Sequence, residues 1–246
     1  MINLKEQFKK NSNFIQYKNR FNLIEIENFI DCNLFEDLRK NFPNEKYFSE
    51  HNDFAMSFSD ENESFSNFLD KDENWKNFIK KFEDQNFVNY LIKLFELKNV
   101  YYGKSWKKYL PFYKKSKISF CFNISKNGGF SLPHTDSSRK LISLVYFFVN
   151  DDWSKKDGGY VNLYKPIDSK YENNWRNLRV EKKNLDVIST IIPKPNKIYG
   201  FKKTKNSYHS VEKVNSEDFK QRKVLMINLI YKNKSDSPFN EKKYIF

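Results

Sequence analysis

The 246-residue chain has little of several residue types that mark particular protein classes. Its two cysteines, Cys32 and Cys121, are too few for a disulfide framework and lack the paired spacing of zinc or iron–sulfur sites. No stretch approaches the ~18 consecutive apolar residues of a membrane span, and the first residues lack the apolar core of a signal peptide. These absences favour a reduced, cytoplasmic setting without a membrane partner.

Alanine is almost missing too: Ala55 is the only one, whereas Lys, Asn, Ile, Phe and Tyr are abundant. AT-rich codons produce this bias, which weakens a functional interpretation of the formal net charge of +13. Clustered lysines would suit a nucleic-acid partner because they neutralise phosphates, but here the lysines are spread throughout the chain. We therefore expect a solvated basic surface, able to attract an anionic substrate, rather than a nucleic-acid interface.

Aromatic residues, by contrast, are plentiful, with 25 Phe, 15 Tyr and 4 Trp, and they supply enough apolar area for a core. A chain of 246 residues is compatible with one large domain. We expect a single domain over residues 1–246, with a helical support region over 1–100, a β core over 101–231 and a tail over 232–246.

Helical signals dominate the first 100 residues. After a short strand in "FNLIEIENFI", Asp31 or Asn33 can cap a helix that Pro43 ends. Apolar residues at helical spacing between Asn74 and Leu97 predict one long helix or two in succession.

Strand signals take over after about residue 100. Short segments rich in β-branched and aromatic residues, such as "KISFCFNI", "KLISLVYFFV", "KIYGF" and "RKVLMINLIY", are separated by turn clusters such as Asn127-Gly128-Gly129. A polar insertion over 166–185 interrupts them. Helices followed by antiparallel strands predict an α+β fold, namely a β-sandwich or jelly roll with the N-terminal helices packed on one sheet.

One of only three histidines lies in "FSLPHTDSSRKLISLVYFF", shortly before an apolar run. Residues two apart in a strand project to the same face, so His134 and Asp136 can offer a nitrogen and a carboxylate oxygen to one point. A closed antiparallel sheet can bring His209 beside them. Two histidines and a carboxylate form the facial triad of non-haem iron(II) oxygenases. The plain alternative is a loop histidine capped by a nearby carboxylate, and His51, in the helical half, is taken as unrelated.

Arg222 opens the last apolar strand, "RKVLMINLIY". A buried guanidinium needs a carboxylate partner, and its planar fork can grip a carboxylate at two points. A dicarboxylate cosubstrate requires such a group at its far end, so Arg222 strengthens the hypothesis of a metal site.

Taken together, the run "PHTDSSRKLISLVYFFVNDDW", a later "DGGYVNLYKP", "YHSVEKV" and "RKVLMINLIY" resemble the 2-oxoglutarate- and iron(II)-dependent dioxygenases of the prolyl-4-hydroxylase-like superfamily. The resemblance covers roughly residues 115–231. It depends on the order of the His-x-Asp pair, an apolar strand ending in Asn-x-x-Trp (Asn150 to Trp153), a Gly-Gly turn, and a distal histidine with a basic residue beyond it.

The resemblance implies a double-stranded β-helix, with His134, Asp136 and His209 as ligands of Fe(II) and Arg222 as the partner of the distal carboxylate of 2-oxoglutarate. It also implies O2 as co-reactant and ascorbate as a stimulant of turnover. The substrate would be a protein side chain, as in prolyl hydroxylases, or a small molecule, hydroxylated at a C–H bond. The alternatives are a catalytically silent β-helix domain that binds a ligand or protein and a nucleic-acid-binding protein.

Three positions refine this expectation. Many family members carry a tyrosine two residues before the Asn of Asn-x-x-Trp, which donates a hydrogen bond to the same distal carboxylate. This chain has Phe148 there, with Tyr146 on the same face as a candidate replacement. The nucleic-acid-demethylating branch usually has a second arginine where this chain has Asn228, which disfavours nucleobase repair. Asp136 keeps the carboxylate that related halogenases replace with a small residue, which favours hydroxylation.

Overall fold

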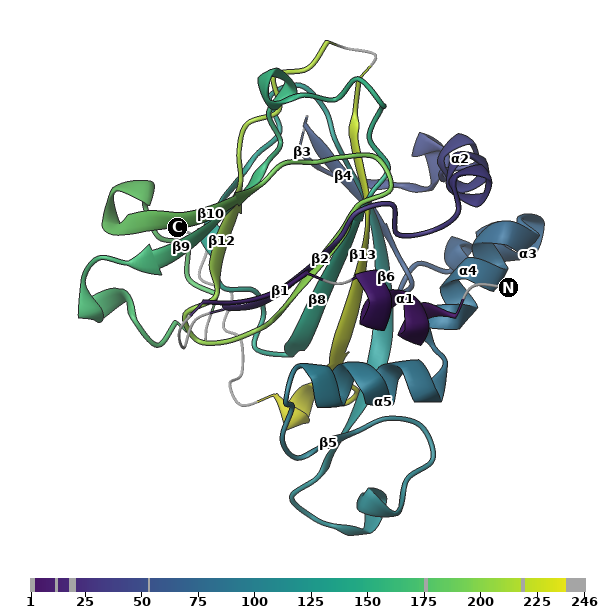
Figure 1. Ribbon diagram of the computed structural model, residues 1–246, viewed down its shortest axis with the longest axis vertical. Helices are drawn as coiled ribbons and strands as arrows, with labels where there is room; N and C mark the ends of the chain where they lie inside the picture. Colours follow the sequence, from purple (N-terminus) through teal and green to yellow (C-terminus); the bar gives the residue numbers. More distant parts are fainter. Residues whose placement is uncertain are drawn as a thin grey trace.

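In the computed structural model, two sheets face each other and a group of helices packs on the outer face of the larger sheet (Figure 1). The structure describes residues 3–11, 13–17, 21–52, 54–174, 177–217 and 220–237. The tail expected over 232–246 is therefore described only as far as Ser237, and the rest of it lies outside the described residues.

The α-helices of the described residues all precede residue 100. They are α1 (Leu4–Asn11), α2 (Cys32–Lys40), α3 (Ser64–Lys71), α4 (Glu73–Phe82) and α5 (Gln85–Leu94). Asp31 caps α2, as predicted, because its side chain accepts hydrogen bonds from the backbone N–H groups of Asn33 and Leu34. The stretch predicted as one helix or two is two, since Asp84 caps a new helix after α4. No helix in the described part of the chain is long and apolar enough to cross a membrane.

The strands form one large and one small sheet. The large sheet has the order β1-β2-β11-β8-β13-β6-β4-β3, with β5 paired to β6, and the small sheet has the order β10-β9-β12-β7. The bounds are β1 (Asn13–Tyr17), β2 (Phe21–Ile26), β3 (Ser49–Asn52), β4 (Ala55–Ser59), β5 (Val100–Tyr101), β6 (Lys114–Ser125), β7 (Ser131–His134), β8 (Lys140–Phe147), β9 (Val161–Pro166), β10 (Leu185–Ile191), β11 (Ile198–Lys202), β12 (Tyr208–Val211) and β13 (Arg222–Tyr231).

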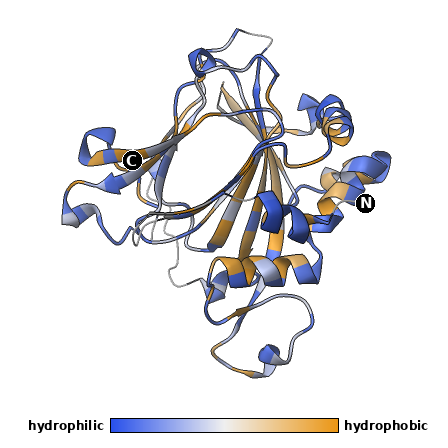
Figure 2. Cartoon of the chain, in the orientation of Figure 1, coloured by the Kyte–Doolittle hydropathy of each residue, from blue (hydrophilic) through white to orange (hydrophobic). Residues whose placement is uncertain are grey.

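The largest hydrophobic core of the described residues lies between the large sheet and the helices, and we call it the helix-side core. It is built mainly from aromatic side chains. Trp75 of α4, for example, packs edge-on against Phe122 of β6, with ring centroids 4.9 Å apart. Figure 2 shows the apolar residues concentrated along the strands of the large sheet and on the helices that cover them. Burial of this aromatic area is the main source of stability on this side.

A second core, the inter-sheet core, lies between the two sheets and includes Val145, Phe147, Leu163, Tyr199 and Val224. Cross-strand partners face the same side of a sheet, and the register pairs Val145 of β8 with both Tyr199 of β11 and Met226 of β13. The predicted α+β fold, a double-stranded β-helix with N-terminal helices on one sheet, is confirmed.

Candidate metal centre

The two predicted histidine ligands lie on neighbouring strands of the small sheet. His134 ends β7, His209 lies in β12, and the two residues are direct cross-strand partners. Their ring centroids are 4.4 Å apart. The sheet pairing thus accounts for the approach of two residues that are far apart in the sequence.

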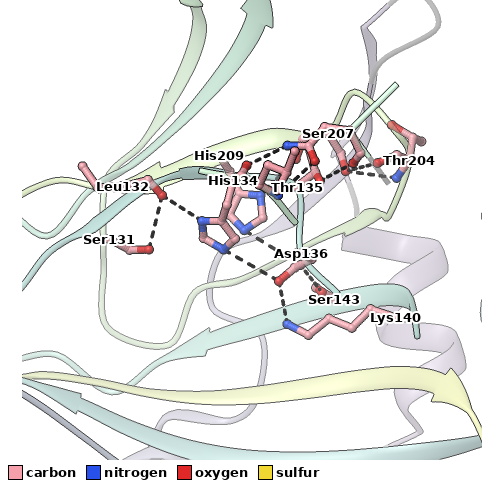
Figure 3. A network of polar contacts seen from close by, with 12 residues as sticks. Ser131, Leu132, His134, Thr135, Asp136, Lys140, Ser143, Thr204, Ser207 and His209 are labelled. Carbon is pink, nitrogen blue, oxygen red and sulfur yellow. Dashed lines mark hydrogen bonds and ion pairs between the residues drawn. The ribbon is translucent and has the colours of Figure 1, made fainter. Parts of the chain in front are cut away.

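Asp136 joins the two histidines, although by a different route from the one predicted. The expected alternation along one strand is wrong, because β7 ends at His134 and Asp136 lies beyond it with a φ of 68°. This left-handed conformation is uncommon for residues other than glycine, and it is typically retained where surrounding contacts enforce it. Here the backbone turns the carboxylate back toward the two imidazole rings (Figure 3).

The orientation of each imidazole is set by a hydrogen bond within its own strand. Nδ1 of His134 lies 2.8 Å from the carbonyl oxygen of Leu132, and Nδ1 of His209 lies 3.0 Å from that of Ser207. A carbonyl only accepts, so Nδ1 carries the proton in each ring and Nε2 keeps its lone pair. These Nε2 atoms lie 3.9 and 3.8 Å from the carboxylate oxygens of Asp136.

The donor set therefore fits a metal ion. One ligand atom from each of His134, Asp136 and His209 can be chosen so that all three lie within 4.8 Å of one another. Two neutral imidazoles and one carboxylate suit Fe(II), and three protein ligands leave positions for other groups. Hydrogen bonds from the distal nitrogens to backbone carbonyls are the usual way in which metal-binding histidines are oriented.

Two further side chains hold the carboxylate of Asp136. Nζ of Lys140 lies 2.8 Å from one oxygen, and the hydroxyl of Ser143 donates to the other at 3.0 Å. Both residues belong to β8 at the end next to the triad. Neither contact was predicted from the sequence, because a spacing of four and seven residues from Asp136 does not by itself bring these side chains to its carboxylate.

The protonation states suit metal binding. Burial, together with the neighbouring His209, lowers the pKa of His134 to about 4, and burial lowers the pKa of His209 as well. Burial alone would raise the pKa of Asp136, but Lys140 and the two histidines outweigh it and hold the pKa well below its usual value. Near neutral pH the centre thus has two neutral imidazoles and an ionised carboxylate, which are the forms that bind metals.

Arg222 lies on the same side of the large sheet as the triad, in the first position of β13. Its side chain is buried, with Nε donating to the carbonyl of Gly159 at 2.7 Å and the guanidinium 5.3 Å from the ring centre of Phe147. Burial lowers its pKa, yet a guanidinium stays charged at neutral pH. Among the described residues no carboxylate forms an ion pair with Arg222. A buried cation in this state fits an anionic ligand, such as the distal carboxylate of 2-oxoglutarate.

Gly159 provides the room that Arg222 needs. Its φ is 65°, and a Cβ added there would lie 2.7 Å from Cδ of Arg222. The Gly-Gly turn was interpreted from the sequence as a turn alone, and the structure adds a direct contact with the candidate anchor.

Aromatic rings connect the two ends of the site. Phe201 packs on His209 with centroids 4.9 Å apart, Tyr199 stacks on Phe201 at 6.4 Å, and Phe147 stacks on Tyr199 at 5.5 Å. Phe147 in turn faces Arg222. We call this row, Phe201, Tyr199 and Phe147, the aromatic wall.

Tyr146 and Phe148 are not part of this wall. Both side chains lie in the helix-side core, on the opposite face of the large sheet from Ser143 and Asp136. The suggestion that Tyr146 could contact the cosubstrate is therefore wrong, because its hydroxyl is directed away from the site and donates to Asn196 at 2.7 Å. Phe147, one residue earlier than the family pattern suggested, occupies the site-facing position.

Asn228 and the polar insertion also lie near the centre. Asn228 is the cross-strand partner of Ser143, and its carboxamide oxygen is buried without a hydrogen-bond partner in the described part of the chain.

In the polar insertion over 166–185, the carbonyl of Asn174 accepts from the hydroxyl of Thr135, and the N–H of Val180 donates to the carbonyl of Pro133. The insertion thus braces the segment that carries His134 and Asp136.

Comparison with known proteins agrees with this geometry. Residues 120–228 match the model of the 2OG-Fe(II) oxygenase superfamily, and this segment contains the whole triad and Arg222. No curated protein matches the sequence.

Solved structures with the same fold include a prolyl-4-hydroxylase from Pseudomonas putida (TM-score 0.50, 11% identity, 93% of this chain and 97% of that chain covered). A prolyl hydroxylase from Trichoplax adhaerens, in complex with a hypoxia inducible factor peptide fragment, aligns with a TM-score of 0.54 at 12% identity over 97% and 91% of the two chains. The non-heme alpha ketoglutarate dependent epimerase SnoN from nogalamycin biosynthesis aligns with a TM-score of 0.53 at 8% identity over 99% and 91%. At such identities the likeness concerns the fold. A segment of this chain thus resembles the 2OG-Fe(II) oxygenase superfamily, and the chain has the fold of the prolyl-4-hydroxylases.

Proposed function

We propose that this protein is a 2-oxoglutarate- and Fe(II)-dependent dioxygenase that hydroxylates a C–H bond, with His134, Asp136 and His209 as the iron ligands. The observation that carries the proposal is the pairing of a facial triad with a buried, carboxylate-free Arg222 on the same side of one sheet. A metal site alone would suit many reactions. The separate cationic anchor favours a cosubstrate that chelates metal at one end and carries a carboxylate at the other.

Bound Fe(II) with 2-oxoglutarate supplies the oxidising power: O2 gives one oxygen atom to the substrate and one to succinate, with release of CO2. The residues of this chain prepare and enclose that reaction. Lys140 and Ser143 fix the Asp136 carboxylate, and the backbone carbonyls of Leu132 and Ser207 fix the two imidazoles. The aromatic wall limits access of water between the triad and Arg222.

We further propose that the substrate is a protein side chain rather than a small molecule. The site side of β6 presents Ser119, Cys121 and Asn123, all partly exposed, beside the carboxamide oxygen of Asn228, which has no hydrogen-bond partner among the described residues. Such a polar surface suits the hydrogen-bonding groups of a peptide. The fold is also that of the Trichoplax prolyl hydroxylase, which was solved with a peptide.

The test is Fe(II)-dependent conversion of 2-oxoglutarate to succinate, measured with and without a panel of proline-containing peptides. Wild-type protein should form succinate slowly without a peptide, while His209→Ala and Asp136→Ala should form none. His51→Ala is the matched control, because this histidine lies in β3 and outside the triad, and it should behave like wild type. Absence of turnover in wild-type protein with confirmed metal uptake would favour a catalytically silent β-helix domain instead.

A further inference from the structure

A loop over 102–113, between β5 and β6, projects from the body of the protein beyond α5, at the bottom of the view in Figure 1. It carries three large side chains in the open: Trp106 is 68% exposed, Tyr109 76% and Phe112 56%. Most of the other described aromatic rings lie in or against the hydrophobic cores. Single exposed apolar residues are ordinary, but several gathered in one place mark an interaction site.

The loop is anchored at its base. The hydroxyl of Tyr102 donates to the carbonyl of Glu83 at 3.0 Å. The carboxamide of Gln85 donates to the carbonyl of Lys104 at 2.9 Å. Beyond these contacts, a 3-10 turn over Trp106–Tyr109 forms the tip. Side chains three residues apart in such a turn eclipse each other, so the first and last rings of the turn lie on one side of it.

Positive charge surrounds the three exposed rings. The stretch 97–117 contains seven lysines and no aspartate or glutamate. Nζ of Lys107 lies 5.0 Å from the ring centre of Tyr113, and Nζ of Lys108 lies 4.6 Å from that of Tyr109. The ammonium groups and the rings therefore form one cluster, and we call the loop over 102–113 the aromatic–lysine loop.

Charge complementarity requires an anionic partner for this cluster. A nearby carboxylate, Asp236, lies 3.6 Å from Nζ of Lys114, and one negative charge leaves a large excess of positive charge. The lysines are joined by apolar residues that hold no charge or hydrogen-bonding side chain, Leu110 and Pro111. The partner must therefore offer both negative charge and an apolar environment.

A lipid bilayer with anionic headgroups meets both requirements. The tip is convex, since its three rings are each more than half exposed, whereas peptides are generally bound in grooves or along sheet edges. Leu110 and Pro111 provide no ring to stack on a nucleobase, and the stretch 97–117 has no arginine for the forked contacts of nucleic-acid sites. Aromatic rings at headgroup level, with lysines on anionic lipid, are typical of membrane-surface segments.

We propose that the aromatic–lysine loop binds the surface of an anionic lipid bilayer. Trp106, Tyr109 and Phe112 insert at the level of the headgroups, and the lysines contact the lipid phosphates. The inference is independent of the proposed function. The expectation of no membrane partner rested on the lack of a spanning segment and of a signal peptide, and peripheral binding requires neither.

Such binding would bring one particular end of the large sheet toward the lipid. The loop leads into β6, where Lys117 pairs with Ile230 of β13, and Ile230 pairs in turn with Lys140 of β8. Lys140 is the residue that contacts Asp136. The aromatic–lysine loop and the candidate metal centre thus belong to the same end of the large sheet.

The test is co-sedimentation of the full chain with vesicles of equimolar phosphatidylcholine and phosphatidylserine. Wild-type protein should bind these vesicles and bind pure phosphatidylcholine much more weakly. Joint replacement of Trp106, Tyr109 and Phe112 by serine should lower the partition constant at least about tenfold, because the burial of three large side chains is lost. The matched control replaces Phe130 and Ile167, which are 61% and 60% exposed on other segments, and it should bind like wild type.

A pair of double variants separates the loop from net charge. Lys107→Gln/Lys108→Gln should lower binding to the mixed vesicles by a factor on the order of ten or more, since each lysine near an anionic surface contributes to binding. Lys155→Gln/Lys156→Gln changes the net charge equally at two neighbouring lysines of another 3-10 turn, and it should bind like wild type. Equal losses in the two double variants would overturn the inference, because they would show a response to net charge alone.

Tryptophan fluorescence reports on insertion directly. Emission of the wild-type protein should shift to the blue when the mixed vesicles are added, and Trp106→Phe should lose this shift while it still binds. Wild-type protein that binds neither kind of vesicle would overturn the inference, as would a triple serine variant that binds like wild type. Binding of oligothymidylate or polyglutamate through this loop, without binding to vesicles, would overturn it too and would assign the loop to a nucleic acid or an acidic protein.

Discussion

The two faces of strand β8 differ in how they treat polar groups. On the helix side, Tyr146 packs among aromatic rings, with Phe29 at 5.3 Å and Phe148 at 4.5 Å, and its hydroxyl is paired with Asn196. On the site side, Ser143 donates a hydrogen bond to Asp136, a candidate metal ligand. Phe147 lies against the guanidinium of Arg222, which has no carboxylate partner among the described residues. One face satisfies its polar groups internally, and the other leaves several for a ligand.

This difference separates stability from function within a single strand. The helix-side face contributes buried apolar area and complete hydrogen bonding, which stabilise the fold. On the same side of the sheet, the neighbouring strand β13 carries Arg222, which has no carboxylate partner among the described residues, and Asn228, whose carboxamide oxygen has no hydrogen-bond partner there; both cost stability unless a ligand binds. Substitutions on the two faces should therefore change different measurements.

The largest effect on the site face is expected for Arg222→Ala. Loss of the buried guanidinium should raise the concentration of 2-oxoglutarate required for half-maximal succinate formation by about a hundredfold or more, because a buried charged partner is worth several kcal/mol. Affinity for Mn(II) should stay the same. A variant with an unaltered 2-oxoglutarate requirement would show that another residue anchors the cosubstrate.

On the helix-side face, Leu144→Ala should act on stability alone. Leu144 is 1% exposed in the helix-side core, so its truncation should lower the free energy of unfolding by about 2–5 kcal/mol. Denaturant titration measures this loss. The folded variant should still bind 2-oxoglutarate as wild type does, and a parallel loss of affinity would mean that the two faces are coupled.

Two glycines offer a smaller, paired test. Gly159→Ala places a Cβ 2.7 Å from Cδ of Arg222 at a φ of 65°, and should weaken 2-oxoglutarate binding and cost about 1–3 kcal/mol of stability. Gly200→Ala instead meets Leu144 on the helix side, and should reduce the melting temperature without changing the affinity. Equal binding losses in the two variants would contradict the division between the faces.

A last comparison concerns the reactivity of the two thiols. Burial raises the pKa of Cys121, on the site side of β6, to about 11, whereas Cys32 is exposed. At pH 8, iodoacetamide should label Cys32 faster than Cys121, by a factor on the order of a hundred, because the thiolate is the reactive form. Labelling of Cys121 should accelerate as the pH rises toward 11. Mass spectrometry of wild type and Cys32→Ser measures both rates, and equal rates at pH 8 would show that the site side of β6 is more open than described.

Much of the fold was predictable from local sequence signals. The cap at Asp31 and the strands after residue 100 follow from residue type and spacing, and the structure confirms them. The short helix α3 and strands β3 and β4 were missed, because their apolar residues are too few to give a clear period.

The site was harder to predict in detail. Nearly every residue of β8 is buried, so the sequence shows no alternation to indicate which face lies toward the triad, and Tyr146 and Phe148 were assigned to the wrong one. The left-handed turn at Asp136 depends on contacts with Lys140 and Ser143 that spacing does not specify.

The most direct test of the central claim is an anaerobic titration of the metal-free protein with Fe(II) and 2-oxoglutarate, followed by visible absorbance. If His134, Asp136 and His209 hold iron that chelates 2-oxoglutarate, a weak charge-transfer band should appear only when both are present, and His209→Ala should lose it while His51→Ala keeps it. Iron uptake without the band in wild-type protein, or a band that persists in His209→Ala, would contradict the account.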